Sequence, residues 1–301
     1  MQKHVFLVAF DKAGSRLDAA ASSFSSQERL GLSRTFIKEL ICSGDVYVNG
    51  SAITKAHHKV KEGDKVEFVF REKEKKELIA QDIKLKIVYD DEDLSVIDKP
   101  SGLVVHPAPG NPDGTLVNAL RNIYPSLSDI NPARPGIVHR LDKGTSGLLV
   151  IAKNNETHLN LAKQFSQHVI KKEYLAIVKG RVEFDEDVIE APISRHAFKR
   201  KNMSVGFTDK AKYAKTYYRT LKRSKDFSVL EIRPFTGRTH QIRVHLDFIG
   251  HPILGDDKYG KNNVFSRLAL HAKTLGFTHP KTGSFMEFSS PIPSEFKDFL
   301  K

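Results

Sequence analysis

The side chains with the clearest capacity for chemistry gather in residues 136–154, GIVHRLDKGTSGLLVIAKN. His139, Arg140 and Asp142 crowd a polar turn that leads directly into an apolar run. A carboxylate in such a turn can stabilise positive charge or attack an electrophilic carbon. An aspartate beside an arginine is also common in surface ion pairs and simple turns, so the spacing alone leaves both interpretations open.

Two glycines and a strand are expected to hold this turn in place. Gly144 and Gly147 permit backbone conformations that other residues resist, which allows a tight bend around Asp142 or the close approach of a nucleotide. Residues 148–152 are apolar and β-rich, and they predict a strand directly after the turn. A rigid strand would therefore position the polar side chains.

From residue 83 onward, short β-rich runs recur with helices between them. Helices are expected at residues 116–123 and 156–168. Because strict βαβ alternation is missing, we predict an α+β fold, with a mixed, mainly antiparallel β-sheet and flanking helices. Besides the strand after the turn, strands are expected at residues 86–89, 94–98, 174–179, 216–221 and 228–234.

Upstream, the sequence predicts a small α/β module of two helices followed by a small sheet. Helices are expected at residues 15–24 and 33–42, and Ser33 can cap the second. Short strands bounded by turn residues should follow at residues 46–48 and 66–70.

The second of these helices should have an apolar stripe with a basic border. Phe36, Ile37 and Leu40 form the stripe, and Arg34 and Lys38 lie beside it. One side of the helix would therefore face a core while its edge carries positive charge.

A charged run marks the expected domain boundary. Residues 71–76, REKEKK, offer almost nothing to bury and predict a linker or an exposed edge. We therefore expect a first domain of residues 1–75 and a second of residues 76–301.

The composition is that of a folded, basic protein. Of its 301 residues 40% are hydrophobic, and 48 Lys and Arg against 36 Asp and Glu give a formal charge of +12. Such an excess attracts polyanions, although ordinary solvated lysines also give a protein this charge.

The single cysteine, Cys42, cannot form an internal disulfide, and no His/Cys cluster has zinc-ligand spacing. Without a signal peptide or an apolar run of membrane-spanning length, a cytoplasmic protein is expected.

Several blocks of sequence resemble the RluA-type family of pseudouridine synthases. HRLDKGTSGLLV, at residues 139–150, is similar nearly letter for letter to the active-site motif of that family. KPSGLVVH at residues 99–106 precedes it, and RPFTGRTHQIRVHL at 233–246 and GHPILGDDKYG at 250–260 follow it. The resemblance spans about residues 80–295 and implies an isomerase that converts uridine in RNA to pseudouridine.

The resemblance makes Asp142 the essential aspartate of the family, which attacks or stabilises the ribose at its anomeric carbon. Breaking the glycosidic bond builds positive charge on the sugar, which a carboxylate can stabilise or capture. An arginine of the TGRTHQIR block pairs with this aspartate in the family; we expect Arg238, with Arg243 as the second choice. Read without the resemblance, alternation along residues 241–246 predicts an exposed strand face for Arg243 and His245, and for His245 this interpretation is favoured.

Three further residues receive roles from the resemblance. Tyr174, in KKEYLAIVKG, matches the family tyrosine that lies against the target base, although a tyrosine in a β-rich run more often packs in a core. Arg140 is expected to pair with phosphate or to enter the RNA stack where the target uridine has flipped out. His139 is expected to support the site and contact the substrate.

About residues 15–70 resemble the RNA-binding module named after small-subunit ribosomal protein S-four. The resemblance rests on SRLD near the start, LSRTFIKELICSGDVYVNG in the middle and VKEGDKVEF at the end. In that family the basic helix edge meets RNA phosphates, so Arg34 and Lys38 are the expected contacts. Ordinary solvated charges on a surface helix are the alternative.

Taken together, the sequence predicts an RNA pseudouridine synthase that acts as a monomer on large-subunit ribosomal RNA. The N-terminal module favours that RNA, because it accompanies such members of the family more than those that modify transfer RNA. An isomerisation implies no cofactor or metal, and no phosphate-binding loop motif occurs. A transfer-RNA enzyme, an inert RNA-binding assembly factor and a nucleoside hydrolase are the alternatives; Asp142, Tyr174 and Arg238 argue against the second, and the fused module argues against the third.

Overall fold

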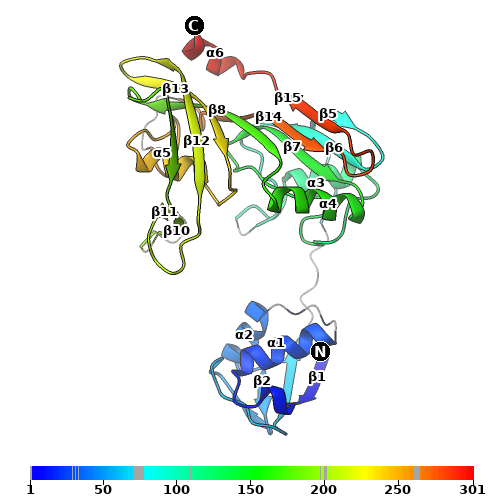
Figure 1. Ribbon diagram of the computed structural model, residues 1–301. Helices are drawn as coiled ribbons and strands as arrows, with labels where there is room; N and C mark the ends of the chain where they lie inside the picture. Colours follow the sequence, from blue (N-terminus) through cyan, green and yellow to red (C-terminus); the bar gives the residue numbers. More distant parts are fainter. Residues whose placement is uncertain are drawn as a thin grey trace. The chain divides into compact units, whose positions relative to one another are not determined.

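The computed structural model describes residues 2–28, 30, 32, 34–70, 78–108, 110–196, 198–199, 202–260 and 265–301. The chain divides into two compact units, Met1–Glu77 and Leu78–Lys301 (Figure 1). The expected linker at residues 71–76, and with it the expected boundary, lies outside the described residues.

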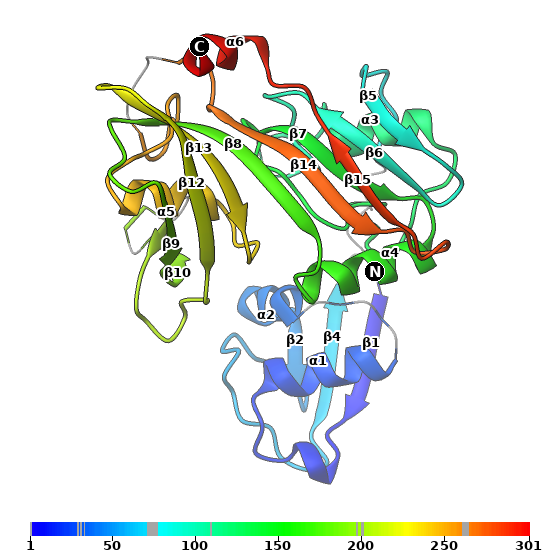
Figure 2. The same ribbon diagram turned by 45° about the horizontal axis from the view of Figure 1, so that its top comes forward.

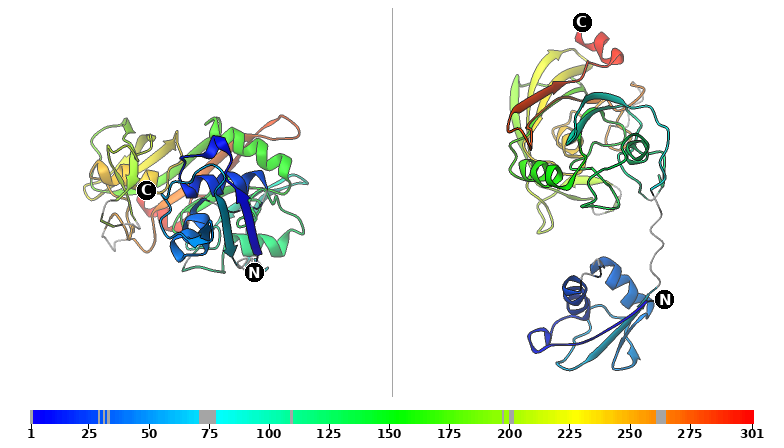
Figure 3. Two further views of the ribbon diagram at one scale, coloured as in Figure 1. Left: turned by 90° about the horizontal axis from the view of Figure 1, so that it is seen from below. Right: turned by 90° about the vertical axis from the view of Figure 1, so that its right-hand side faces the viewer.

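The N-terminal unit packs two helices, α1 (Leu17–Gln27) and α2 (Arg34–Ser43), against an antiparallel sheet (Figure 3). The apolar stripe of α2 is confirmed, since Ile37 and Leu40 are buried and Phe36 packs against the same core. Ser33, the predicted cap, lies outside the described residues. In the order β1-β4-β2-β3, the strands are β1 (Gln2–Leu7), β4 (Lys65–Phe70), β2 (Val46–Val48) and β3 (Ser51–Ala52).

The larger unit is built on a nine-stranded sheet in the described part of the chain (Figure 2). Eight of its strands form the path β5 (Lys86–Asp90), β6 (Leu94–Lys99), β7 (Ser146–Ala152), β14 (Leu270–Thr278), β8 (Lys171–Lys179), β13 (Phe227–Pro234), β12 (Lys215–Arg223) and β9 (Glu186–Glu190). The ninth, β15 (Phe285–Ser289), pairs with β14. Neighbouring strands are antiparallel except β7 and β14, which run parallel. The predicted α+β class is confirmed.

Smaller elements surround this sheet. A two-stranded hairpin consists of β10 (Ile193–Arg195) and β11 (Met203–Val205). The helices are α3 (Leu116–Ile123), α4 (Asn155–Ser166), α5 (Gln241–Phe248) and α6 (Ser294–Leu300). Among the residues described, none of the helices has the length and apolar character that crossing a membrane requires.

Helices cover both faces of the sheet at β7. Successive side chains of a strand point to opposite faces, so Leu149 packs in one cluster with Leu120 of α3, and Val150 packs in another with Leu161 of α4. Every residue of β7 is consequently buried. The turn that carries Asp142 leads into this buried strand, which therefore holds the turn in a fixed position.

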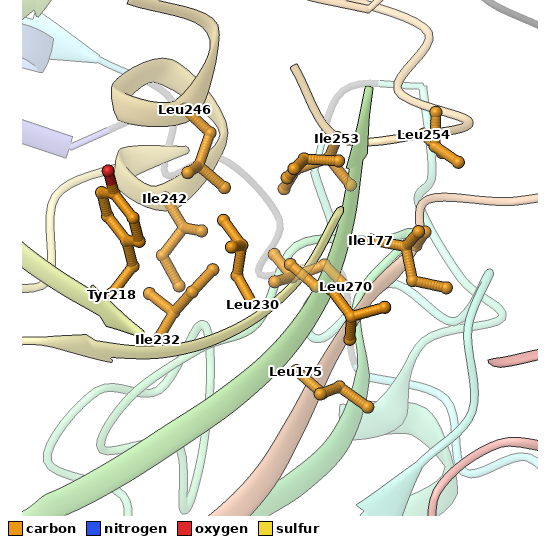
Figure 4. Packing of buried hydrophobic residues seen from close by; sticks show 14 of the residues in the cluster. Leu175, Ile177, Tyr218, Leu230, Ile232, Ile242, Leu246, Ile253, Leu254 and Leu270 are labelled. Atoms are coloured by element: carbon orange, nitrogen blue, oxygen red, sulfur yellow. The ribbon is translucent and has the colours of Figure 1, made fainter. Parts of the chain in front are cut away.

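Helix α5 packs on the other half of the sheet. Ile242 and Leu246, one helical turn apart, lie in a core with Leu230 and Ile232 of β13 and Tyr218 of β12 (Figure 4). This core fixes the position of the first turn of α5, which also carries the polar residue Arg243.

The strand predicted at residues 241–246 is wrong, because these residues form the start of α5. Their alternating pattern suits a helix here because both sides of the helix are covered. Ile242 and Leu246 face the sheet core, while Val244 packs in a separate cluster with Ile193 and Ala214. An apolar pattern of period two was therefore produced by two different contacts of one helix.

Candidate active site

A cavity of about 560 Å³ opens beside the turn that precedes β7. Its walls come from this turn, from β8 and α4, and from the loop that leads into α5. Asp142, Tyr174 and Arg243 all line it. The structure thus brings together three segments that are far apart in the sequence, in a space within the size range of small-ligand sites.

Asp142 is partly exposed in this cavity and is held from one side. Its carboxylate Oδ2 accepts a hydrogen bond of 3.0 Å from Nη1 of Arg243, while 18% of its side chain remains exposed. A charge-assisted hydrogen bond of this kind is short and strong, and it fixes the orientation of the carboxylate. The other oxygen, Oδ1, is left to face the cavity and His240.

Arg243 is itself anchored by a second, buried carboxylate. Its Nε and Nη2 each donate to one oxygen of Asp256 at 2.7 Å, and Asp256 also accepts the backbone N–H groups of Lys258 and Tyr259. Burial alone would lower the pKa of Arg243, but the hydrogen bonds and charge of Asp256 outweigh it and raise that pKa. The guanidinium is therefore charged and held in one geometry.

The expected pairing of Arg238 with Asp142 is wrong in this structure. Arg238 lines the cavity but is exposed, and its Nε donates to the carbonyl oxygen of Tyr213 at 3.0 Å. The amide oxygen of Gln241 accepts from the backbone N–H of Arg238, which ties the turn before α5 to the first residue of the helix. Arg243, the second choice, occupies the inner position.

His245 is likewise not on an exposed strand face. It is fully buried on α5, where Nε2 donates to the carbonyl oxygen of Ala191 and Nδ1 accepts from the hydroxyl of Thr216, both at 2.9 Å. Burial lowers its pKa, so the ring is a neutral link between α5 and the neighbouring strands.

Tyr174 reaches the cavity because glycine lets three strands meet closely. Tyr174 on β8 lies opposite Ala272 on β14, and Ala272 lies opposite Gly147 on β7. Gly147 has φ +108, and a Cβ there would lie 2.1 Å from the carbonyl oxygen of Ala272. Burial first, and the charge of Asp142 second, raise the pKa of Tyr174, so its phenol is protonated at neutral pH.

The two residues before Leu141 have different surroundings. His139 stacks on Phe165 at 4.4 Å, and its Nε2 accepts the backbone N–H of Val150. Burial lowers the pKa of His139 to about 3, which keeps this acceptor neutral. His139 thus joins the turn to β7, whereas Arg140 is exposed at the cavity wall.

Sequence reasoning missed Lys99, Asp256 and His240 as members of this region. Lys99 is fully buried, and its Nζ donates to the carbonyl oxygens of Pro100, Leu103 and Lys143. Burial lowers its pKa to about 7. All three missed residues lie in the sequence blocks that carry the family resemblance, which is the signal that would have found them.

Arg34 and Lys38 belong to the N-terminal unit, where both are exposed on α2. Arg34 donates to Oδ2 of Asp18 through Nε at 3.3 Å and Nη2 at 3.1 Å, and Arg16 donates to the same carboxylate. Asp18 is only 3% exposed, although the two arginines remain accessible. The buried aspartate therefore orders two arginines at the surface of this unit.

The N-terminal and central parts of the chain match two family models. The model for RNA pseudouridylate synthase matches residues 93–248, and that for the S4 domain matches residues 26–66. An uncharacterized RNA pseudouridine synthase of Bacillus subtilis is 42% identical over 95% of this chain and 97% of its own length. The chain belongs to the RNA pseudouridylate synthase family.

Other members of the family are similarly close. The ribosomal large subunit pseudouridine synthase D of Vibrio parahaemolyticus is 40% identical over 94% of this chain and 89% of its own length. Among solved structures, human RNA pseudouridylate synthase domain containing 1 has a TM-score of 0.60 at 27% identity, covering 74% of this chain and 88% of that one. The resemblance to pseudouridine synthases and to the S-four module is thus confirmed, and the protein is an RNA pseudouridine synthase.

Proposed function

We propose that this pseudouridine synthase modifies uridines of large-subunit ribosomal RNA and that Asp142 is its catalytic carboxylate. The observation that carries the proposal is the pairing of Asp142 with Arg243 in a cavity that also holds Tyr174. Relatives such as the Vibrio parahaemolyticus enzyme, whose name gives the ribosomal large subunit as its substrate, support the choice of RNA.

The reaction moves the sugar from one ring atom of the same uracil to another. The bond between the anomeric carbon and ring nitrogen 1 breaks, the uracil turns, and ring carbon 5 bonds to the anomeric carbon. Carbon 5 loses a proton and nitrogen 1 gains one, so the product is an isomer of the substrate. The detached base has to stay bound throughout this sequence.

Asp142 acts in the steps that place positive charge on the sugar. Loss of the base gives the ribose oxocarbenium character, which an adjacent carboxylate stabilises or captures as an ester. Arg243 orients Asp142 through its hydrogen bond, while Asp256 keeps Arg243 in place.

Tyr174 and Arg140 hold the RNA around the reacting nucleotide. The ring of Tyr174 provides a face for the uracil, and base–aromatic stacking contributes about 1–3 kcal/mol. Because its phenol is protonated, Tyr174 serves first as a stacking surface. Arg140, exposed beside the cavity, pairs with phosphate or fills the gap that the flipped uridine leaves.

The N-terminal unit supplies a second contact with RNA in this proposal. Arg34 and Lys38 are exposed cations on α2, and Asp18 orders Arg34 without covering it. Phosphate contacts of this type add affinity without reading sequence, and they weaken as salt rises.

Pseudouridine mapping of ribosomal and transfer RNA from cells without this protein tests the proposal. The cells are complemented with wild type or with Asp142→Asn. We expect loss of pseudouridine at one or more large-subunit sites, restored by wild type and not by Asp142→Asn. Loss confined to transfer RNA would overturn the choice of substrate, and restoration by Asp142→Asn would overturn the role of Asp142.

A further inference from the structure

His240 faces the free side of Asp142 across a gap that no hydrogen bond closes. Its Nε2 lies 3.9 Å from Oδ1 of Asp142, and 12% of its side chain is exposed. Both residues line the cavity. The distance is too long for a direct hydrogen bond, which for these atoms has its limit near ~3.2 Å.

The backbone at His240 holds the ring in an uncommon position. His240 has φ +56, in the left-handed region that residues other than glycine seldom adopt. Gln241 follows it directly and ties the turn down, since its amide bonds Thr236, Thr216 and the carbonyl oxygen of Lys215. Strain of this kind persists where surrounding contacts impose it, often at functional sites.

We assign the hydrogen of the His240 ring from its contact with Tyr259. Nδ1 of His240 lies 2.9 Å from the hydroxyl of Tyr259, whose oxygen accepts the backbone N–H of Met203. The phenol has one hydrogen to donate, and Nδ1 is placed to accept it. The hydrogen of the neutral ring is then on Nε2, which faces Asp142.

The ring is neutral in spite of the nearby carboxylate. Burial lowers the pKa of His240, and it outweighs the charge of Asp142, which acts in the opposite direction. Arg243, held by Asp256, already supplies the positive charge that Asp142 requires. His240 therefore presents a neutral N–H donor, and Asp142 Oδ1 presents an acceptor, to the same point in the cavity.

One hydroxyl oxygen fits between these two groups. An oxygen about 2.8 Å from each, an ordinary hydrogen-bond length, spans a separation of this size with a bent geometry. It accepts the N–H of His240 and donates its own hydrogen to Asp142. A keto oxygen of the base has no hydrogen to donate, so the pair selects a hydroxyl group.

We propose that His240 and Asp142 together bind the 2′-hydroxyl of the target uridine, which makes His240 a residue that selects ribonucleotides. The proposal rests on the proposed function, in which Asp142 acts at the anomeric carbon. The carbon that bears the 2′-hydroxyl is bonded to the anomeric carbon, so this is the ribose hydroxyl nearest to the carbon at which Asp142 acts. The 2′-hydroxyl distinguishes RNA from DNA at a given nucleotide.

A cycle that combines a substitution in the enzyme, at His240, with a substitution in the RNA, at the 2′ position of the target nucleotide, tests the proposal. Full-length wild type, His240→Asn and His240→Gln are assayed on one RNA that carries either uridine or 2′-deoxyuridine at the modified position. Asn tolerates the left-handed backbone but has no donor at the position of Nε2, whereas the amide nitrogen of Gln restores one. The readout is kcat/KM, and dissociation constants of the two RNAs are compared in the same way.

The cycle isolates the contact between His240 and the 2′-oxygen. On the uridine RNA, His240→Asn should lower kcat/KM roughly ten-fold, the loss expected for one hydrogen bond, and His240→Gln should recover most of it. On the deoxyuridine RNA, wild type and His240→Asn should agree within about two-fold. If turnover of this RNA is too slow to measure, the same pattern is expected in the dissociation constants.

Two results would overturn the proposal. One is an equal loss for His240→Asn on both RNAs, in rate and in binding, which would make His240 a structural residue only. The other is a wild-type enzyme that treats both RNAs alike. Failure of wild type to form pseudouridine in any RNA would instead contradict the proposed function.

Discussion

At the scale of single residues, the site depends on a buried guanidinium shared by two carboxylates. Two guanidinium nitrogens of Arg243 donate to Asp256, and the third donates to Asp142. Desolvated charges of this kind are costly unless each is paired, and removing one partner leaves another unpaired. The arrangement is therefore sensitive to the shape of the guanidinium as well as to its charge.

Arg243→Lys should impair the enzyme far more than Arg238→Lys. A lysine cannot bind Asp256 at two points and reach Asp142 at the same time, so we expect kcat/KM to fall at least roughly 100-fold. Arg238→Lys keeps a charge at an exposed position and should stay within about five-fold of wild type. The measurement is pseudouridine formation under steady-state conditions. The reverse order of the two losses would restore Arg238 as the partner of Asp142.

His139 should make the protein less stable in acid. Its pKa is about 3 in the folded protein against 6.5 for the free side chain, so between these values the unfolded chain binds more protons. The contribution of His139 to the free energy of unfolding is then fully present above about pH 6.5. It is lost as the pH drops, by at most about 1.4 kcal/mol per pH unit.

The control for His139 is His139→Gln, which keeps an acceptor for the N–H of Val150 but cannot titrate. Urea unfolding of both proteins at pH 4.5 and pH 7 measures the effect. The variant should lose less stability than wild type between these values. An equal loss in both proteins would show that His139 does not contribute.

At the scale of elements, the turn with Asp142 is placed by β7 and its neighbours. Gly147 allows β7 to lie close to β14, and β14 pairs on its other side with β8, which contains Tyr174. A side chain at residue 147 would therefore push apart the strands that bring Asp142 and Tyr174 together. The glycine serves the site through the sheet, without touching a substrate itself.

Gly147→Ala should destabilise the larger unit by about 3 kcal/mol or more, because its Cβ would overlap the carbonyl oxygen of Ala272. Gly283→Ala is the matched control: Gly283 also has a positive φ, of +71, but nothing lies within 4 Å of its added Cβ. The control should cost about 1 kcal/mol for backbone strain alone. Thermal unfolding of both variants measures the difference, and equal losses would remove the steric argument.

The sequence was sufficient to predict the turn with Asp142, but not the arginine that pairs with Asp142. Asp142 and the strand after it could be predicted because the apolar run and the motif lie side by side in the chain. Arg243 could not be chosen over Arg238, because the choice depends on contacts made in the folded protein, with Asp256 for Arg243 and with Tyr213 for Arg238. The helix at residues 241–248 also escaped prediction, since its two covered faces produce the alternation of a strand.

At the scale of the whole molecule, two units with different chemistry share one chain. In the larger unit Asp142 and Arg243 form an ion pair inside a cavity, whereas the N-terminal unit presents exposed cations on α2. The formal charge of +12 adds a general attraction for RNA to both. Affinity and chemistry should therefore respond to different substitutions.

The double variant Arg34→Ala, Lys38→Ala should weaken RNA binding and reduce its dependence on salt. Two lost phosphate contacts should make the fall of log K, the association constant for RNA, with log salt concentration less steep by about 2. Turnover at saturating RNA should stay close to wild type. Lys55→Ala with Lys61→Ala removes the same charge elsewhere in this unit and is the control. If both double variants give the same slope, the effect belongs to net charge and not to α2.

The most direct test of the central claim uses purified protein and a large-subunit ribosomal RNA transcript labelled with tritium at carbon 5 of uracil. Pseudouridine formation releases that tritium, so the assay follows the reaction itself. Wild type should release it in step with pseudouridine detected at defined positions, and Asp142→Asn should bind the RNA but release none. Release by Asp142→Asn at a rate near wild type would contradict the account, because the carboxylate held by Arg243 would then not carry the chemistry.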